Sequence, residues 1–318
     1  MAGLDILCLG EPLVEFNDRG GGLWREGLGG DVSNVAIAAA RQGARSGIAT
    51  RLGADAFGDA FVAAWTREGL DTSAVARDAD APTGLYFVRH DEDGHHFEYR
   101  RAGSAASRMA PDTLPEQAIR EAGILHLSGI TQAISGSAEA AGTAAIRIAK
   151  AAGRRVSYDP NLRLRLWPLE RARAVIHGAM AEADIALPGL EDARTLTGLT
   201  DPERIVAFYR ELGPTIVALT LGSDGALVAA GERCVRLPAP PVRAVDATGA
   251  GDCFDGAFLA RLAATGDPFE AGRYAVAAAA LSVQGYGAVD PIPTAERVEA
   301  LLAGVADRAA PGPPDAAS

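Results

Sequence analysis

Short apolar runs alternate with segments of helical periodicity along most of this chain. Apolar runs occupy residues 4–9, 46–52, 124–127, 155–158, 184–187 and 215–220. In the intervening segments apolar residues recur every three or four positions, at 138–152, 169–180, 190–197, 202–212, 252–265, 268–283 and 294–302. Short runs of this kind predict buried strands, and the recurrence predicts amphipathic helices. The alternation therefore predicts an α/β fold: a mainly parallel sheet covered by helices on both faces.

A second, smaller sheet is predicted outside this alternation. Residues 83–88 and 96–101 flank Asp91-Glu92-Asp93-Gly94, a turn sequence typical of a β-hairpin, and residues 12–16 form another strand candidate. Because these strands interrupt the helical segments, we expect them to project from the main domain, within about residues 11–28 and 83–103.

Composition narrows the possible functions. The 318 residues carry a net charge of −11, which argues against a nucleic-acid or anionic-membrane partner. Lys150 is the only lysine, so a Gly-x-x-x-x-Gly-Lys-Ser/Thr phosphate loop is impossible, and phosphate would have to be bound by backbone amides and arginine.

Cysteines and the chain ends indicate a cytoplasmic protein. Cys8, Cys234 and Cys253 are odd in number and scattered, which predicts neither a metal cluster nor a disulfide framework. No signal peptide or membrane-spanning apolar run is expected. Residues 307–318, rich in Pro, Ala and Gly, predict a disordered tail after a single domain at 1–306.

The clearest chemical signal lies at residues 246–258. Gly249, Ala250 and Gly251 precede a predicted helix, and free N–H groups at a helix start form an anion site. Asp252 has two interpretations: it caps the helix, or it lies beside a phosphate as a general base. The local sequence leaves both open.

Glycines also precede the helix predicted at residues 35–42. Asp31, Ser33 and Asn34 follow Gly29 and Gly30 directly. Capping by Asp31 or Ser33 is one interpretation, and ligand binding is the other.

Residues 246–258 resemble the C-terminal signature of the ribokinase (PfkB) family of carbohydrate kinases, and the resemblance extends over about residues 5–303. It implies a ribokinase-like three-layer α/β/α fold whose small sheet is a lid over the sugar, with ATP and Mg²⁺ as cofactors. The anion hole would be formed by Gly249, Ala250, Gly251 and Asp252, with Asp252 as the base. Sugar hydroxyls would be held by Gly30, Asp31 and Asn34. A lid with exposed edges also predicts a homodimer.

The nucleotide and metal sites follow from the same resemblance. Residues 220–225 resemble the family's ATP-binding turn, and the implied nucleotide contacts are Asn161, Arg165, Thr220, Gly222, Ser223, Gly225, Thr248, Gly249 and Gly251. Glu191 matches the family's Asn-x-x-Glu magnesium motif, but Pro188 replaces the asparagine, so a contact through water is implied. A monovalent cation near Asp246 is left open.

The substrate is suggested by three further matches. The first is Tyr99-x-Arg101-x-Gly-Ser-Ala-Ala together with the Tyr86 of Thr-Gly-Leu-Tyr, the second is Asp159-Pro-Asn-Leu-Arg163, and the third is Gly10-Glu11-Pro12-Leu13-Val14-Glu15-Phe16. All three resemble segments of 2-keto-3-deoxygluconate kinases. The resemblance implies that Tyr86, Tyr99, Arg101, Arg163 and Asp290 bind a sugar acid. It predicts ATP-dependent phosphorylation of 2-dehydro-3-deoxy-D-gluconate at its terminal hydroxyl, giving 2-dehydro-3-deoxy-6-phosphogluconate.

Two other functions stay open at this point. One is a different sugar kinase of the family, such as a fructokinase, a ribokinase or a related deoxy-sugar-acid kinase. The other is a sugar-binding sensor that has lost catalysis, against which the intact Gly249-Ala250-Gly251-Asp252 argues.

Overall fold

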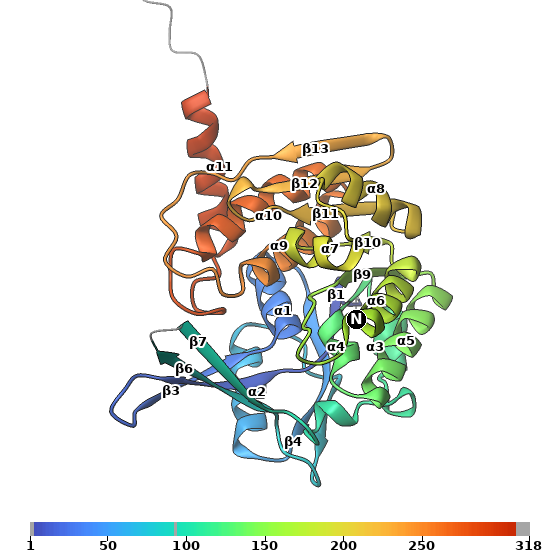
Figure 1. Ribbon diagram of the computed structural model, residues 1–318, viewed down its shortest axis with the longest axis vertical. Coiled ribbons are helices and arrows are strands. Elements are labelled where there is room, and N and C mark those ends of the chain that lie inside the picture. Colours follow the sequence, from blue (N-terminus) through green and yellow to red (C-terminus); the bar gives the residue numbers. More distant parts are fainter. Residues whose placement is uncertain (1–2, 92–93, 310–318) are drawn as a thin grey trace, which may run out of the picture.

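A nine-stranded sheet runs through the centre of the molecule, with helices packed on both of its faces (Figure 1). The structure is a computed structural model that describes residues 3–91 and 94–309. The strand order is β13-β12-β11-β10-β9-β8-β1-β4-β5. The bounds are β1 Ile6–Leu9, β4 Ser46–Gly53, β5 Val75–Asp78, β8 Ile124–Ser128, β9 Arg155–Asp159, β10 Ile185–Ala186, β11 Ile216–Thr220, β12 Ala226–Ala230 and β13 Arg233–Leu237.

All neighbouring strands from β11 to β5 pair in parallel, and only β12 and β13 are antiparallel additions at one edge. The carboxyl ends of the parallel strands therefore meet at one edge of the sheet, where ligands bind in folds of this class. The predicted mainly parallel α/β sheet is confirmed.

Side chains on the two faces of the sheet enter two separate hydrophobic clusters. Ile6 and Cys8 of β1 belong to one cluster, while Leu7 and Leu9 belong to the other, because successive strand residues point to opposite faces. Helices of the first cluster are α1 Asp31–Arg41, α2 Ala56–Arg67, α9 Ala250–Thr265, α10 Pro268–Ser282 and α11 Ala295–Ala309. Helices of the second are α3 Glu116–Glu121, α4 Gly129–Ala133, α5 Gly136–Ala151, α6 Leu169–Glu182, α7 Leu190–Thr197 and α8 Pro202–Leu212.

The predicted lid is a separate four-stranded sheet with the order β3-β2-β6-β7 (Figure 1). Its strands are β2 Leu13–Asp18, β3 Trp24–Gly29, β6 Leu85–Asp91 and β7 Gly94–Arg100. The hairpin pairs Asp91 with Gly94, and residues 92 and 93 of the predicted turn lie outside the described residues. The edge strands are β3 and β7, and homodimerisation through them stays a prediction.

Several predicted boundaries were wrong. Helix α1 begins at Asp31 rather than at residue 35, and α9 begins at Ala250 rather than at Asp252. Helix α11 continues to Ala309, three residues into the predicted tail, and residues 310–318 lie outside the described part. Within residues 3–91 and 94–309, no helix combines the length and apolar character that a membrane span requires.

Candidate active site

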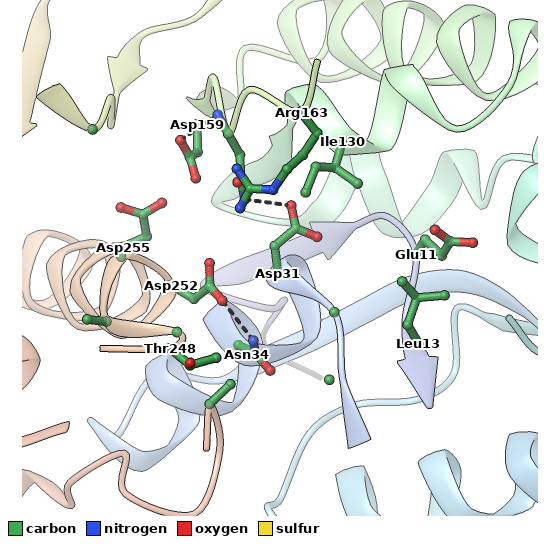
Figure 2. Close-up of a pocket in the computed structure, with 18 of the residues that line it drawn as sticks. Glu11, Leu13, Asp31, Asn34, Ile130, Asp159, Arg163, Thr248, Asp252 and Asp255 are labelled. Carbon is green, nitrogen blue, oxygen red and sulfur yellow. Dashed lines mark hydrogen bonds between the residues drawn. The ribbon is translucent and has the colours of Figure 1, made fainter. Parts of the chain in front are cut away.

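A cavity of about 740 Å³ lies between the lid and the carboxyl ends of the parallel strands (Figure 2). Helix starts, strand ends and the lid all contribute to its lining. Among the residues predicted from the sequence, those that line it are Gly30, Asp31, Asn34, Tyr86, Tyr99, Arg101, Asn161, Arg163, Arg165, Thr220, Thr248, Gly249, Ala250, Gly251 and Asp252.

The start of α9 forms the floor of this cavity. Gly249 precedes the helix with φ 73°, a left-handed conformation, and a Cβ on it would lie 2.8 Å from the Cβ of Ala288. Glycine is therefore required there by the backbone itself. Gly251 is different, because a Cβ there would meet no protein atom within 4 Å. The space beside Gly251 belongs to the cavity.

The first turn of α9 supplies the donors of an anion site. Within the part of the chain that the structure describes, the N–H groups of Gly251 and Asp252 have no acceptor. Such groups at the positive end of a helix attract a phosphate. The predicted anion hole would use these two N–H groups.

Asp252 is the third residue of α9, and no side chain caps this helix. The capping interpretation of Asp252 is therefore wrong. Its Oδ2 instead accepts a hydrogen bond of 2.7 Å from Asn34 Nδ2, across from α1 (Figure 2). Among the described residues Asp252 forms no ion pair.

The surroundings raise the pKa of Asp252 to about 7. Burial is the largest cause, and the negative charge of Asp31 adds to it, whereas the Asn34 hydrogen bond and the charge of Arg163 act in the opposite direction. A carboxyl group that titrates near neutrality can take a proton from a hydroxyl at physiological pH.

The start of α1 lies opposite Asp252. Gly30 has φ 108°, and no side chain caps this helix either, so capping by Asp31 or Ser33 was wrong. Asp31 accepts hydrogen bonds from Ser128 Oγ and, at 3.1 Å, from Asn161 Nδ2. The hydroxyl of Ser33 points into the core and accepts a hydrogen bond of 2.9 Å from Trp65 Nε1.

Four further carboxylates line the cavity, and the sequence analysis assigned none of them as a ligand: Glu11, Asp159, Asp192 and Asp255. Burial raises the pKa of each. The negative charges of Asp192 and Asp252 raise the pKa of Asp159 further, and those of Asp159 and Asp252 raise the pKa of Asp255 further. Asp255 is only 2% exposed, and one of its carboxyl oxygens has no hydrogen-bond partner among the described residues. Its position three residues after Asp252, on the same face of α9, was the available signal.

The lid contributes an aromatic wall. Tyr86 and Tyr99 stack with ring centroids 5.5 Å apart, and the guanidinium of Arg101 lies 5.1 Å from the centroid of Tyr99. The hydroxyl of Tyr86 donates a hydrogen bond to Glu15. Arg101 forms an ion pair with Glu11, whose side chain is fully buried.

Two arginines reach the cavity from the loop after β9. Arg163 Nη1 donates to the carbonyl of Leu162 at 2.8 Å, and no carboxylate among the described residues forms an ion pair with it. Arg165 Nη1 donates to the carbonyl of Phe97 at 3.2 Å and so connects this loop to the lid. Trp167, which follows them, is 7% exposed and belongs to the core.

Five of the predicted site residues do not line the cavity. Gly222, Ser223 and Gly225 lie in the turn after β11 and do not line the cavity, whereas Thr220, the last residue of β11, does. The side chain of Glu191 is 82% exposed and paired with Arg194. Asp290 forms an exposed ion pair of 3.0 Å with Arg25 of β3, at the edge of the lid.

Comparison with known proteins identifies the family. The model of the pfkB family carbohydrate kinases matches residues 13–295. The chain belongs to the pfkB family of carbohydrate kinases. It is an ATP-dependent carbohydrate kinase, as the sequence predicted.

Individual relatives resemble the chain over nearly its full length. The 2-dehydro-3-deoxygluconokinase of Thermoproteus tenax is 36% identical and that of Bacillus subtilis 34%, each over 94% of this chain and over 94% and 95% of the relatives. Fructokinase-1 of Zea mays is 33% identical over 93% of this chain and 97% of its own.

Solved structures confirm the predicted ribokinase-like fold. A PfkB protein from Polaromonas superposes with a TM-score of 0.85 at 36% identity, over 94% of this chain and 100% of its own. An Escherichia coli protein assigned as a ribokinase II, solved with ATP and Mg²⁺, superposes with a TM-score of 0.87 at 26% identity, over 95% and 99%.

Proposed function

We propose that this pfkB kinase transfers the terminal phosphoryl group of ATP to 2-dehydro-3-deoxy-D-gluconate. The product would be 2-dehydro-3-deoxy-6-phosphogluconate. The observation that carries the kinase chemistry is the Asp252 carboxyl group at the start of α9, with a pKa of about 7 beside two free N–H groups. The two relatives named 2-dehydro-3-deoxygluconokinase support the choice of sugar.

Asp252 acts as the general base of the reaction. Its carboxylate takes the proton of the terminal hydroxyl as that oxygen attacks the phosphorus, and the bond to the leaving oxygen of ADP breaks. Donors that are already oriented stabilise charge on the transferred group without reorganisation. Here these donors are the N–H groups of Gly251 and Asp252.

The carboxylates of the cavity fit a magnesium ion. Mg²⁺ prefers oxygen ligands and commonly binds one or two carboxylates together with substrate phosphates. Asp159 and Asp192 line the cavity, and a nearby cation would relieve the repulsion that raises their pKa values. When bound, Mg²⁺ neutralises negative charge on the phosphates. The exposed Glu191, paired with Arg194, fits this role less well.

The sugar carboxylate would be bound by a cation that lines the same cavity. Arg163 lines it without a carboxylate partner among the described residues. Tyr86 and Tyr99 supply a flat wall and hydroxyl groups for the sugar chain, and Asp31 and Asn34 face its other hydroxyls.

A fructokinase is the second candidate, and one observation favours it. The charge of Arg101 is already compensated by Glu11, so this end of the cavity is less cationic than the sequence implied. The 33% identity to a fructokinase of Zea mays fits the same alternative.

Turnover measurements with a panel of substrates test the proposal. We expect the highest kcat/KM for 2-dehydro-3-deoxy-D-gluconate, and a higher value for fructose or ribose would refute the choice of sugar. Asp252→Asn should lower kcat by about 10²–10⁴-fold while ATP still binds. The matched control is Glu191→Gln, which removes an acid outside the cavity and should leave kcat within about twofold of wild type. Near wild-type turnover in Asp252→Asn would refute the assignment of the base.

A further inference from the structure

The ion pair between Glu11 and Arg101 joins the main domain to the lid in the wall of the cavity. Glu11 lies in the link between β1 and β2, and both residues line the cavity. The Glu11 side chain is completely buried, and that of Arg101 is 12% exposed. Ser104 Oγ donates a hydrogen bond of 3.1 Å to Glu11 Oε1. Glu11 Oε1 therefore accepts a hydrogen bond, and Oε2 forms the ion pair with Arg101.

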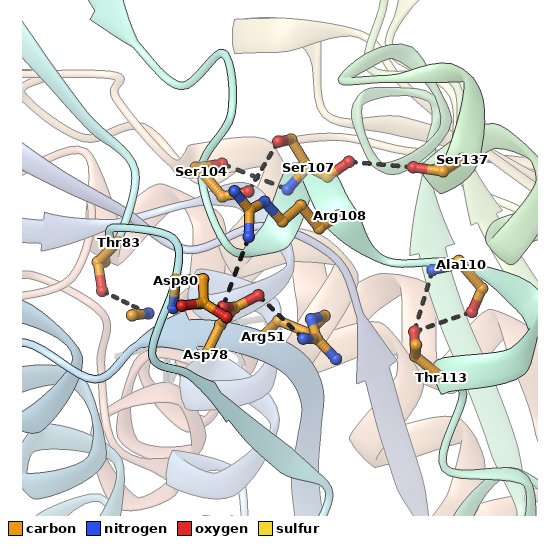
Figure 3. Close-up of polar contacts among 11 residues, drawn as sticks. Arg51, Asp78, Asp80, Thr83, Ser104, Ser107, Arg108, Ala110, Thr113 and Ser137 are labelled. Atoms are coloured by element: carbon orange, nitrogen blue, oxygen red, sulfur yellow. Dashed lines mark hydrogen bonds and ion pairs between the residues drawn. The ribbon is translucent and has the colours of Figure 1, made fainter.

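Arg101 is held on both sides along the chain. Before it, β7 carries Tyr99, whose ring lies under the guanidinium. After it, a network anchors the chain to the main domain (Figure 3): Ser107 Oγ donates to the Ser104 carbonyl at 2.7 Å, and Ser137 Oγ donates to the Ser107 carbonyl at 3.2 Å. Because both flanks are fixed, the position of Arg101 does not depend on Glu11 alone.

The main effect of Glu11 is then on charge. The cavity contains five aspartates besides Glu11, namely Asp31, Asp159, Asp192, Asp252 and Asp255, and three arginines, namely Arg101, Arg163 and Arg165. Glu11 cancels the positive charge nearest to the stacked tyrosines of the lid. In a buried site such a charge strongly affects the binding of a second anion.

We infer that Glu11 is a specificity-determining residue: by neutralising Arg101 it limits the preference of the cavity for acidic over neutral sugars. This inference rests on the proposed function for the sugar acid, because it concerns how tightly that acid is bound. Nothing in the local sequence of Gly10-Glu11-Pro12 indicated it, since the ion pair forms only in the folded chain.

Glu11→Gln isolates the charge. A glutamine has the same shape, and its amide can accept from Arg101 while its NH₂ group donates to Ser104 Oγ. We expect the ratio of the dissociation constants of D-fructose and 2-dehydro-3-deoxy-D-gluconate, measured by calorimetry without nucleotide, to rise about tenfold in favour of the acid. Ser104→Ala is the control, since it removes a hydrogen bond to Glu11 but keeps the charge, and its ratio should equal that of wild type. In turnover, the gain should appear as a lower KM for the acid.

A double variant tests the same inference even if Glu11→Gln alone does not fold normally. Glu11→Gln combined with Arg101→Met removes both charges of the pair, a change that buried ion pairs commonly tolerate. The gain for the acid should disappear in this double variant. An unchanged or lower ratio in Glu11→Gln, or a raised ratio in the double variant, would overturn the inference. If wild type does not phosphorylate the sugar acid, the proposed function fails, and the effect of Glu11 is still decided by the binding ratios.

Discussion

The hydrogen bond from Asn34 to Asp252 should determine the pH at which this kinase becomes active. Asn34 Nδ2 donates to Asp252 Oδ2 at 2.7 Å, and this contact lowers the pKa of the carboxyl group against the larger effect of burial. An N–H donor stabilises the charged carboxylate more than the neutral acid. In Asn34→Ala the pKa of Asp252 should therefore rise above its value of about 7.

The size of the shift follows from the strength of the bond. A hydrogen bond to a charged group contributes about 1.5–3 kcal/mol, and one pKa unit corresponds to about 1.4 kcal/mol. The pKa should thus rise by about 1–2 units. At pH 7 the ionised fraction of Asp252 would fall from about a half to about a tenth or less.

The assay is kcat/KM for the sugar between pH 5.5 and 9.5, followed by ADP release, because this parameter reports the pKa of the free enzyme. Asn34 also lines the sugar site, so kcat/KM at the high-pH plateau should fall in the variant. The decisive quantity is the pH at which kcat/KM falls on the acidic side of the profile, the acid limb. Asp31→Asn is the matched variant of opposite sign: it removes a charge that raises the pKa of Asp252, so its limb should move to lower pH. If both variants keep the wild-type limb, Asp252 is not the titrating group.

Four further predictions concern stability, two of them together with turnover. Because the folded pKa of Asp252 exceeds the value of about 4 in an unfolded chain, its ionisation destabilises the native state as the pH rises from about 4 to 7. Asp252→Asn should therefore raise the melting temperature at pH 8 but not at pH 4, and an equal gain at both would contradict the raised pKa. Gly249→Ala should cost about 1–3 kcal/mol of unfolding free energy in urea titrations, since φ is 73° there. Gly251→Ala should not destabilise the fold but should lower kcat, because its methyl group enters the anion site. Ser33→Ala should cost about 1–3 kcal/mol with unchanged kcat, since Trp65 Nε1 loses its acceptor in the core.

Patterns repeated along the chain were sufficient to predict the architecture. Several buried strands of the main sheet are largely apolar runs, such as Ile6–Leu9, because helices cover both faces. Strand β3, Trp24–Gly29, was not predicted, since its residues are mostly polar or glycine and partly exposed. An edge strand of a lid lacks the apolar signal of a core strand.

Helix starts were misplaced for a related reason. Gly30 and Gly249 precede their helices in positive-φ conformations, and neither helix has a side-chain cap. The start of a helix is predicted from a capping side chain. Because the residue before each of these helices is a glycine, both starts were predicted too late in the chain. The polar residues of these first turns bind other partners instead: Ser33 of α1 accepts from Trp65, and Asn34 of α1 donates to Asp252 of α9.

The charged residues of the cavity that the sequence missed are all acids. Glu11, Asp192 and Asp255 look like ordinary surface charges until the fold buries them. Their character comes from partners far along the chain: Glu11 contacts Ser104, 93 residues away, and Asp192 accepts from the Leu162 amide, 30 residues away. Contacts of that range leave no trace in local spacing.

The placement of Asp252 is energetically unfavourable for the fold, and that is the strongest argument for its proposed chemistry. It caps no helix and forms no ion pair among the described residues, and burial and Asp31 raise its pKa by disfavouring the charged form. A residue with only a structural role would be replaced by asparagine or serine without this cost. Groups with strongly shifted pKa values are concentrated at functional sites because catalysis uses the shift. Selection of the sugar depends on other residues, Glu11 and Arg101 at the base of the lid, so the two properties can be changed independently by mutation.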